Sequence, residues 1–176
     1  MSRIVEEIEV AVPVRVAYDQ WTQFESFPRF MDGVERVVQV DDKTLEWTAR
    51  VAGVVKHWRA EILEQQPDQV VAWRSVDGAQ NDGRVQFRSV GADRTIVEVQ
   101  LDVEPEGLVE KAADALGVVE RRVRGDLVRF RDFIESRAEP TGAWRGRVEG
   151  GRVEDDDDDD PGAGARPEPT EIGRHG

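Results

Sequence analysis

The chain has 176 residues and a formal net charge of −13, and it contains no cysteine. The length suits one domain with an extension, the absence of cysteine excludes disulfide bonds and thiolate metal sites, and the negative charge argues against binding to nucleic acid. The first residues lack the apolar run of a signal peptide and no apolar stretch reaches the ~18 residues of a membrane span, so we expect a cytoplasmic protein without stable membrane insertion.

The predicted elements begin with a strand over residues 4–12, where apolar and polar side chains largely alternate. Pro13 ends this strand. Apolar residues at spacings of three and four over 14–25 predict a helix, and an aromatic segment follows at 27–31. The N-terminal third therefore combines one strand with a helical, aromatic-rich segment.

The middle of the chain, from residue 34 to residue 105, is predicted to be a succession of strands. Apolar and polar residues alternate in short runs that end at turn residues such as Gly53 and Gly78. The runs cover residues 34–40, 45–51, 58–62, 71–75, 85–87 and 95–103. Alternation of this kind indicates an antiparallel sheet with one face in solvent.

A long helix is the last predicted element before the composition changes. Its single apolar stripe has steps of three and four residues and consists of Leu116, Val119, Val123, Leu127, Phe130 and Ile134. A helix from about residue 107 to residue 136 would be roughly 45 Å long. That length is enough to cross the whole face of a curved sheet.

The composition changes sharply after Arg137, so the sequence predicts one domain over residues 1–137 and a tail over residues 138–176. The tail is rich in Gly, Pro and Asp, and we expect it to be disordered, although Trp144 offers one anchor that could pack back onto the domain. The run Asp155–Asp160 lacks the spaced ligands of a calcium loop, so it is interpreted as a solvated acidic segment and not as a metal site.

Several local segments resemble a known superfamily. They are residues 18–31 (Tyr-Asp-Gln-Trp through Pro-Arg-Phe-Met), 58–62, 71–75, 83–87 and 126–135. These segments, in this order, are similar to the START-like (SRPBCC) superfamily, in particular to its polyketide cyclase/dehydrase and coenzyme Q-binding START-type domains. The resemblance covers about residues 3–137. It implies an α+β helix-grip fold, in which a curved antiparallel sheet wraps around a long C-terminal helix with an apolar cavity between them.

The alternation of side chains gives a candidate set for the cavity. The predicted wall consists of Trp47, Trp58, Trp73, Ser75, Phe87, Val99, Leu127 and Phe130. The predicted gate consists of Trp21, Phe24, Phe27, Phe30 and Gly53. Large, rigid aromatic walls suit a flat or long lipophilic ligand, but the same side chains could simply fill the core.

Catalytic residues are not predicted. His57 and Arg59 alternate with Trp58 and should therefore point to solvent, Ser75 has no neighbouring base, and no close pair of inward carboxylates is evident. No zinc, P-loop or dinucleotide-binding pattern is present, so no metal or cofactor is expected.

Three functions are compatible with this sequence. The first is a binding module for a small lipophilic ligand such as a lipid, quinone or polyketide-like aromatic. The second, which rests on the resemblance, is a polyketide aromatase/cyclase or dehydrase-type enzyme. The third is an accessory interaction protein that acts through its acidic tail.

Overall fold

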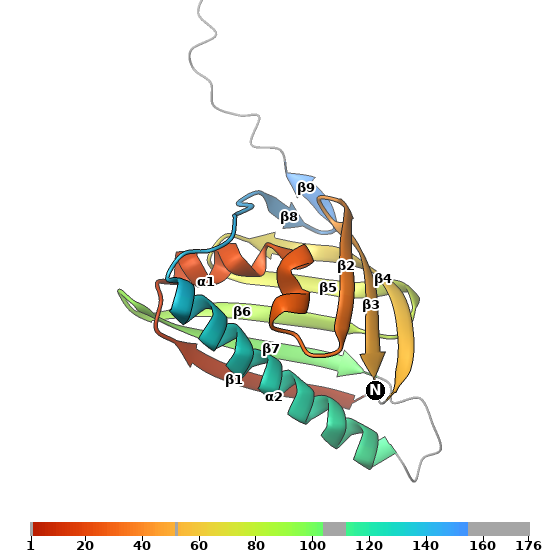
Figure 1. Cartoon of the computed structure of the whole chain (residues 1–176). Helices are drawn as coiled ribbons and strands as arrows, with labels where there is room; N and C mark the ends of the chain where they lie inside the picture. The colour runs from red at the N-terminus through yellow and green to blue at the C-terminus, as the bar shows by residue number, and fades with distance from the viewer. Residues whose placement is uncertain (1, 52, 104–111, 155–176) are drawn as a thin grey trace, which may run out of the picture.

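A computed structural model describes residues 2–51, 53–103 and 112–154 of the chain (Figure 1). The helical elements are α1 (Val14–Trp21), the 3-10 helix η1 (Phe24–Arg29) and α2 (Ala112–Arg137). The strands are β1 (Ser2–Val10), β2 (Val34–Asp41), β3 (Thr44–Val51), β4 (Val54–Gln66), β5 (Val70–Gly78), β6 (Asp82–Gly91), β7 (Arg94–Val103), β8 (Arg147–Glu149) and β9 (Arg152–Glu154).

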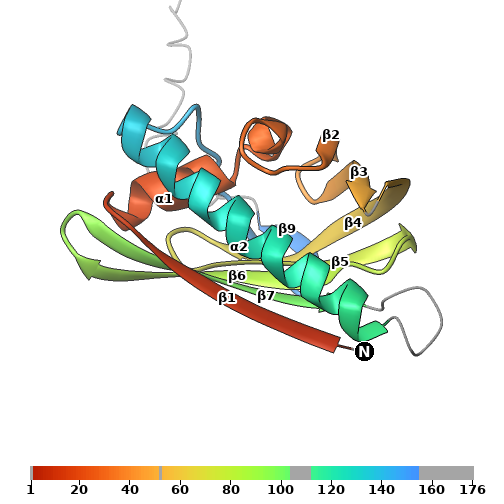
Figure 2. The same cartoon turned by 60° about the horizontal axis from the view of Figure 1, so that its bottom comes forward.

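The sheet is antiparallel at every described strand pair and has the order β1-β7-β6-β5-β4-β3-β2. It is curved, and α1, η1 and α2 all lie on its concave side (Figure 2). Helix α2 runs diagonally across this side, close to β1 (Figures 1 and 2). The helix-grip architecture predicted from the sequence is therefore confirmed.

Bulges in the middle of the β4–β5 pair help to curve the sheet. The pairing of β4 with β5 shifts register between Arg59 and Ala60 and again between Ile62 and Glu64, and an extra residue bends its strand and increases its twist. Gly78 ends β5 with a φ of +86°, and a Cβ there would collide with the carbonyl oxygen of His57. The close approach of these two strands therefore requires glycine.

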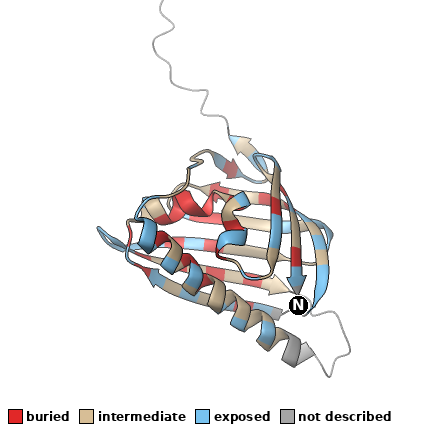
Figure 3. Ribbon diagram, in the orientation of Figure 1, coloured by how far each residue is buried: buried red, intermediate tan, exposed pale blue. Residues whose placement is uncertain are grey.

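Aromatic side chains form the centre of the core, beneath α1 and α2. The Trp21 ring packs edge to face against Phe130 and Phe27, with centroids 5.1 and 5.4 Å apart, and Tyr18 packs in the same way against Phe87. Such edge-to-face pairs add stability beyond the burial of their area. Figure 3 shows α1 as mostly buried and buried residues recurring along the strands.

The composition predicts a disordered tail from residue 138 onward, but this prediction is wrong for residues 138–154. Residues 147–154 form the β8–β9 hairpin, β8 pairs with β4 through Val148 and Gln65, and Val148 is fully buried. Trp144 packs against the core, as its aromatic character suggested. The folded domain therefore continues beyond Arg137 to Glu154. The acidic run 155–160 and the rest of the tail lie outside the described residues.

Ion pairs and hydrogen bonds fasten this extension to α1. The Arg145 guanidinium binds Asp19 at 2.6 Å and both carboxylate oxygens of Asp68 at 3.1 and 2.9 Å, and it lies over the ring of Tyr18. The backbone N–H of Trp144 donates to Thr22 Oγ1. The Asp19 side chain is only 6% exposed, and its charge is compensated mainly by Arg145, with a longer ion pair of 3.7 Å to Arg15.

Tyr18 gives the first testable prediction. Burial raises the pKa of its phenol to about 12. Below pH ~10 the hydroxyl is protonated in both the folded and the unfolded chain, whereas between about 10 and 12 only the unfolded chain ionises. The free energy of unfolding should therefore fall by roughly 2 kcal/mol across that window.

Tyr18 is the only tyrosine in the chain, so the absorbance of tyrosinate reports its titration directly. We expect a midpoint near 12 in the native protein. The Tyr18→Phe variant should lose both the absorbance change and this share of the alkaline destabilisation. A native midpoint near the ordinary value of about 10 would show that the phenol is not buried as described.

Candidate functional site

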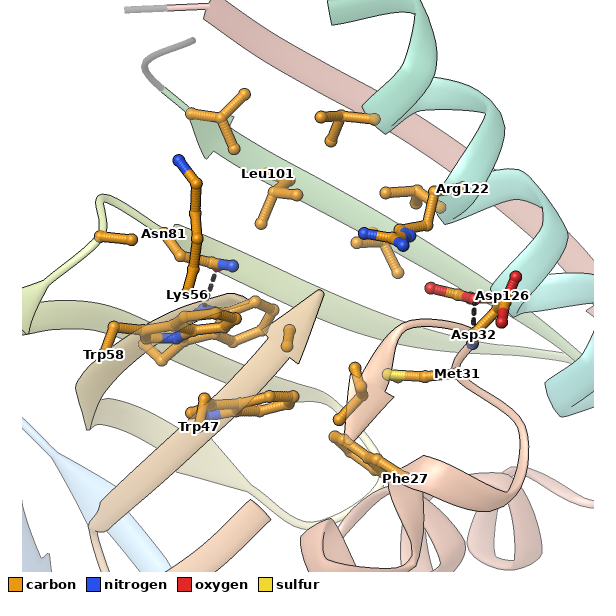
Figure 4. Close-up of a pocket in the computed structure, with 18 of the residues that line it drawn as sticks. Phe27, Met31, Asp32, Trp47, Lys56, Trp58, Asn81, Leu101, Arg122 and Asp126 are labelled. Atoms are coloured by element: carbon orange, nitrogen blue, oxygen red, sulfur yellow. Dashed lines mark hydrogen bonds between the residues drawn. The ribbon is translucent and has the colours of Figure 1, made fainter. Parts of the chain in front are cut away.

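A cavity of about 480 Å³ lies between the concave face of the sheet and α2 (Figure 4). Apolar side chains of β3, β4, β5 and β7 form its floor and one wall, α2 forms the opposite wall, and the segment from Phe24 to Asp32 closes a third side. Its depth comes from the curvature of the sheet, which keeps the middle strands away from α2. The sequence prediction of an apolar cavity at this place therefore matches the structure.

Tryptophans form a flat wall on the sheet side of the cavity. Trp47 on β3 and Trp58 on β4 are direct cross-strand partners, and their rings stack with centroids 5.6 Å apart at an interplanar angle of 7°. Trp73 on the next strand is held by a hydrogen bond of 3.1 Å from its Nε1 to Asn81 Oδ1. The period of two in β3, β4 and β5 brings all three indoles to the same face.

Polar groups of α2 face this wall from the other side of the cavity (Figure 4). Arg122 and Asp126 are one helical turn apart. The Arg122 guanidinium donates to the carbonyl oxygen of Arg50 at 2.7 Å, which ties α2 to the end of β3. Asp126 Oδ1 accepts hydrogen bonds from the Asp32 backbone N–H, at 2.9 Å, and from the Arg129 guanidinium.

The environment of Asp126 changes its affinity for protons. Burial raises the pKa of this carboxyl above its usual range. The hydrogen bonds from Arg129 and from the backbone of Asp32, together with the positive charges of Arg129 and Arg122, act in the opposite direction and offset burial only in part. Asp126 is thus a partly desolvated carboxyl at the edge of an apolar cavity.

Most of the predicted wall residues line the cavity, but some belong to the core. Trp47, Trp58, Trp73, Val99 and Leu127 line it, as predicted. Phe87 and Phe130 are buried against Trp21 and do not line it. The Ser75 hydroxyl is not part of the lining either, because it lies 3.5 Å from Asp82 Oδ1 and accepts a hydrogen bond from the backbone N–H of Asn81.

The predicted gate residues divide in the same way. Trp21, Phe24 and Phe27 line the cavity, whereas Phe30 is 1% exposed and packs against Phe130 in the core. Gly53 lies in the exposed turn between β3 and β4 with a φ of +81° and does not line the cavity. The aromatic segment after α1 therefore contributes one side of the cavity and part of the core.

The residues predicted to point outward do so. His57 is exposed and its Nδ1 lies 3.1 Å from Thr48 Oγ1, and Arg59 is exposed and pairs with Glu46 at 2.6 Å. Neither side chain belongs to the cavity lining. His57 is therefore not placed to act on a ligand in this cavity.

The alternation of side chains does not predict the polar part of the lining, since it gives no close pair of inward carboxylates. The polar residues that line the cavity are Asp32, Lys56, Asn81, Arg122 and Asp126. On α2, positions 122 and 126 each directly precede a member of the apolar stripe and so border it, but a charged residue at such a position normally faces solvent. Asp32 and Asn81 lie in connections between elements, where neither the helical nor the strand period of side-chain direction applies.

Two features are absent from the described residues. Within residues 2–51, 53–103 and 112–154, no group of histidine, aspartate and glutamate side chains is arranged to hold a metal ion. In the same ranges, no helix combines the length and apolar character needed to span a membrane.

Comparisons with known proteins agree with this architecture. Residues 10–131 match the model of a family described as polyketide cyclase / dehydrase and lipid transport. An uncharacterized 17.2 kDa protein of Streptomyces lincolnensis is 51% identical over 149 residues, which are 84% of this chain and 99% of that protein.

Solved structures are similar as well. A Deinococcus radiodurans crystal structure, 27% identical, covers 77% of this chain and 98% of its own with a TM-score of 0.60. The Zhui aromatase/cyclase of Streptomyces sp. R1128, 17% identical, covers 81% of this chain and 99% of its own with a TM-score of 0.67. At that identity, the second match supports the fold alone.

Proposed function

This chain belongs to the polyketide cyclase / dehydrase and lipid transport family, and on that premise we propose that it binds a small lipophilic molecule in the cavity between the sheet and α2. The ligand class is a lipid, a quinone or a polyketide-like aromatic. The observation that carries the proposal is the lining, because four of the five tryptophans of the chain face one apolar cavity.

The size and surface of the cavity support this proposal. Its volume of about 480 Å³ falls within the range of pockets that enclose drug-sized molecules. Apolar surface buried by a ligand contributes about 25 cal/mol per Å², part of which is offset by the entropy lost on association. The parallel stack of Trp47 and Trp58 favours ligands that contain a flat ring system.

The tryptophans also provide the assay, and Trp58→Ala is the variant that tests them. We expect lipophilic quinones or polycyclic aromatics to quench the tryptophan fluorescence of the full chain to saturation. Trp58→Ala removes one of the three indoles of the tryptophan wall. The affinity should weaken by about tenfold or more, equivalent to roughly 1.4 kcal/mol or more. Trp144 lies outside the cavity lining, so Trp144→Phe should leave the affinity unchanged.

A second variant separates loss of binding from loss of folding. Val123 lines the cavity from α2, and Val123→Phe would occupy part of the empty volume. We expect this variant to lose ligand affinity and to keep the melting temperature of the wild-type chain. If Val123→Phe binds like wild type, or if no probe gives a saturable signal, the cavity is not the binding site.

An aromatase/cyclase activity is the second candidate function. It is favoured by the ionisable side chains Asp126 and Lys56, which line the cavity alongside the tryptophans, and by the name of one structural neighbour. A carboxylate next to a bound polyketide could exchange protons with it. A binding module returns its ligand unchanged and an enzyme does not, so the mass of the ligand recovered after incubation distinguishes the two.

A further inference from the structure

The cavity combines an aromatic wall with a few polar groups. Trp47 and Trp58 lie on the sheet side together with Lys56 and Asn81, and Arg122 and Asp126 lie on the α2 side (Figure 4). A ligand that lies between the indoles and α2 therefore places apolar surface against the indoles and polar atoms against Arg122 and Asp126. The hydrogen bonds already made on the α2 side indicate which polar atoms these are.

Asp126 retains an unused hydrogen-bond acceptor. Its Oδ1 receives hydrogen bonds from the Asp32 backbone N–H and from the Arg129 guanidinium. Its Oδ2 receives none from the described part of the chain, although the side chain is only 14% exposed. A partly desolvated carboxylate oxygen without a donor gains most from a donor that a ligand supplies.

The charges around Asp126 restrict what that donor can be. The ionisable residues of the described lining are Asp32, Lys56, Arg122 and Asp126, two acidic and two basic. An anionic head group such as a carboxylate has no proton to donate to Oδ2 and would meet the Asp126 charge directly. An ammonium group could donate to Asp126, but Lys56 and Arg122 line the same cavity and disfavour another cation. A neutral hydroxyl can donate a hydrogen bond to the carboxylate without repulsion from Asp126 or from Lys56 and Arg122.

We propose, building on the proposed function, that the ligand is a hydroxylated ring compound whose hydroxyl group donates a hydrogen bond to Asp126 Oδ2 while its rings lie against the tryptophan wall. Asp126 is then the residue that selects a neutral, hydroxyl-bearing ligand over a fatty acid or a fully substituted ring. Its role is recognition of the ligand, and no bond is formed or broken.

Three small probes share one ring system and differ only in the polar group: 2-naphthol, 2-methoxynaphthalene and 2-naphthoate. Isothermal titration of the full chain should give the tightest binding for 2-naphthol. The methyl ether cannot donate, and we expect it to bind about tenfold more weakly, because a hydrogen bond to a charged group is worth roughly that factor or more. The naphthoate anion should also bind at least about tenfold more weakly, through repulsion by Asp126.

Asp126→Asn replaces the charged acceptor by a neutral one and should reduce the preference for the naphthol over the ether to about threefold or less. Asp132→Asn is the matched control, because Asp132 lies on the same helix with its side chain 65% exposed. This control should keep the tenfold preference. Melting curves of both variants establish that they are folded.

The affinities of the wild-type chain for the three probes test the hydroxyl preference even if Asp126→Asn does not fold. Equal affinity for naphthol and ether, or tightest binding of naphthoate, overturns the hydroxyl preference and leaves lipophilic binding intact. Unchanged selectivity in a folded Asp126→Asn protein overturns the role of Asp126. Failure of all three probes overturns the inference for ring compounds, and the proposed function fails too only if quinones and fatty acids also give no signal.

Discussion

A chain that ends at Arg137 is expected to lose at least about 4 kcal/mol of its free energy of unfolding, whereas a chain that ends at Glu154 should melt like the full-length protein. The first truncation removes Arg145, which leaves the Asp19 carboxylate, 6% exposed, with only the longer ion pair of 3.7 Å to the exposed Arg15. Breaking a buried ion pair by removing one partner costs about 3–5 kcal/mol.

The hairpin adds to this cost. Val148 is fully buried beside β4, and its removal returns roughly 1.5 kcal/mol or more of apolar burial to water. Residues 155–176 contain a single large apolar residue, Ile172, so their removal should change the free energy of unfolding little. Chemical denaturation of the three chains measures the difference.

A point variant separates the ion pair from the rest of the extension. Arg145→Met keeps the length of the side chain and removes its charge, and we expect most of the loss seen on truncation at Arg137. Arg152 is exposed on β9, and Arg152→Met should be near neutral. If the chain that ends at Arg137 is as stable as the full chain, the segment 138–154 contributes nothing to the stability of the fold. The domain would then end at Arg137, as the composition predicts.

This result also bears on the hypothesis that the protein acts through its acidic tail. A deletion from residue 138 onward would remove Arg145 and Val148 together with the tail, so lost partner binding could reflect a destabilised domain. A deletion from residue 155 onward removes the acidic run alone. Only the second deletion tests that hypothesis cleanly.

The sheet was predictable because the alternation of side chains is a local property of a strand. In β7, Thr95, Val97, Val99 and Leu101 are buried and their neighbours are not, as the alternation in the sequence predicted. The β8–β9 hairpin was not predictable, because its strands of three residues are too short to show a period. Contacts with residues distant in the sequence hold it in place: Val148 pairs with Gln65, and Arg145, just before β8, binds Asp19 and Asp68.

The site was predictable on one side only. The alternation of side chains along β3, β4 and β5 predicted that their three tryptophans point inward. An inward position indicates burial, but it does not distinguish a cavity wall from a filled core. Phe87 and Phe130 have the inward positions of wall residues, yet the rings of α1 fill the space beside them. Asp126 was missed because a charged residue beside an apolar helical stripe normally faces solvent, and only the curvature of the sheet leaves space there.

Phe130→Ala is expected to destabilise the protein by about 3–5 kcal/mol, because Phe130 belongs to the core and not to the cavity wall. The ring is fully buried between Trp21 and Phe30, with centroids 5.1 and 5.4 Å away. Its removal leaves a void that these large, interlocked rings cannot easily close. Denaturant unfolding of the variant and the wild type measures the difference.

Phe133 provides the matched control for this substitution. It lies on the same helix, is half-buried, and packs against Phe30 with centroids 5.3 Å apart. Phe133→Ala should therefore cost clearly less than Phe130→Ala, since less apolar surface leaves the interior. A Phe130→Ala protein that keeps its full stability but no longer binds a ligand would instead place this ring in the cavity wall, where the sequence alone had put it.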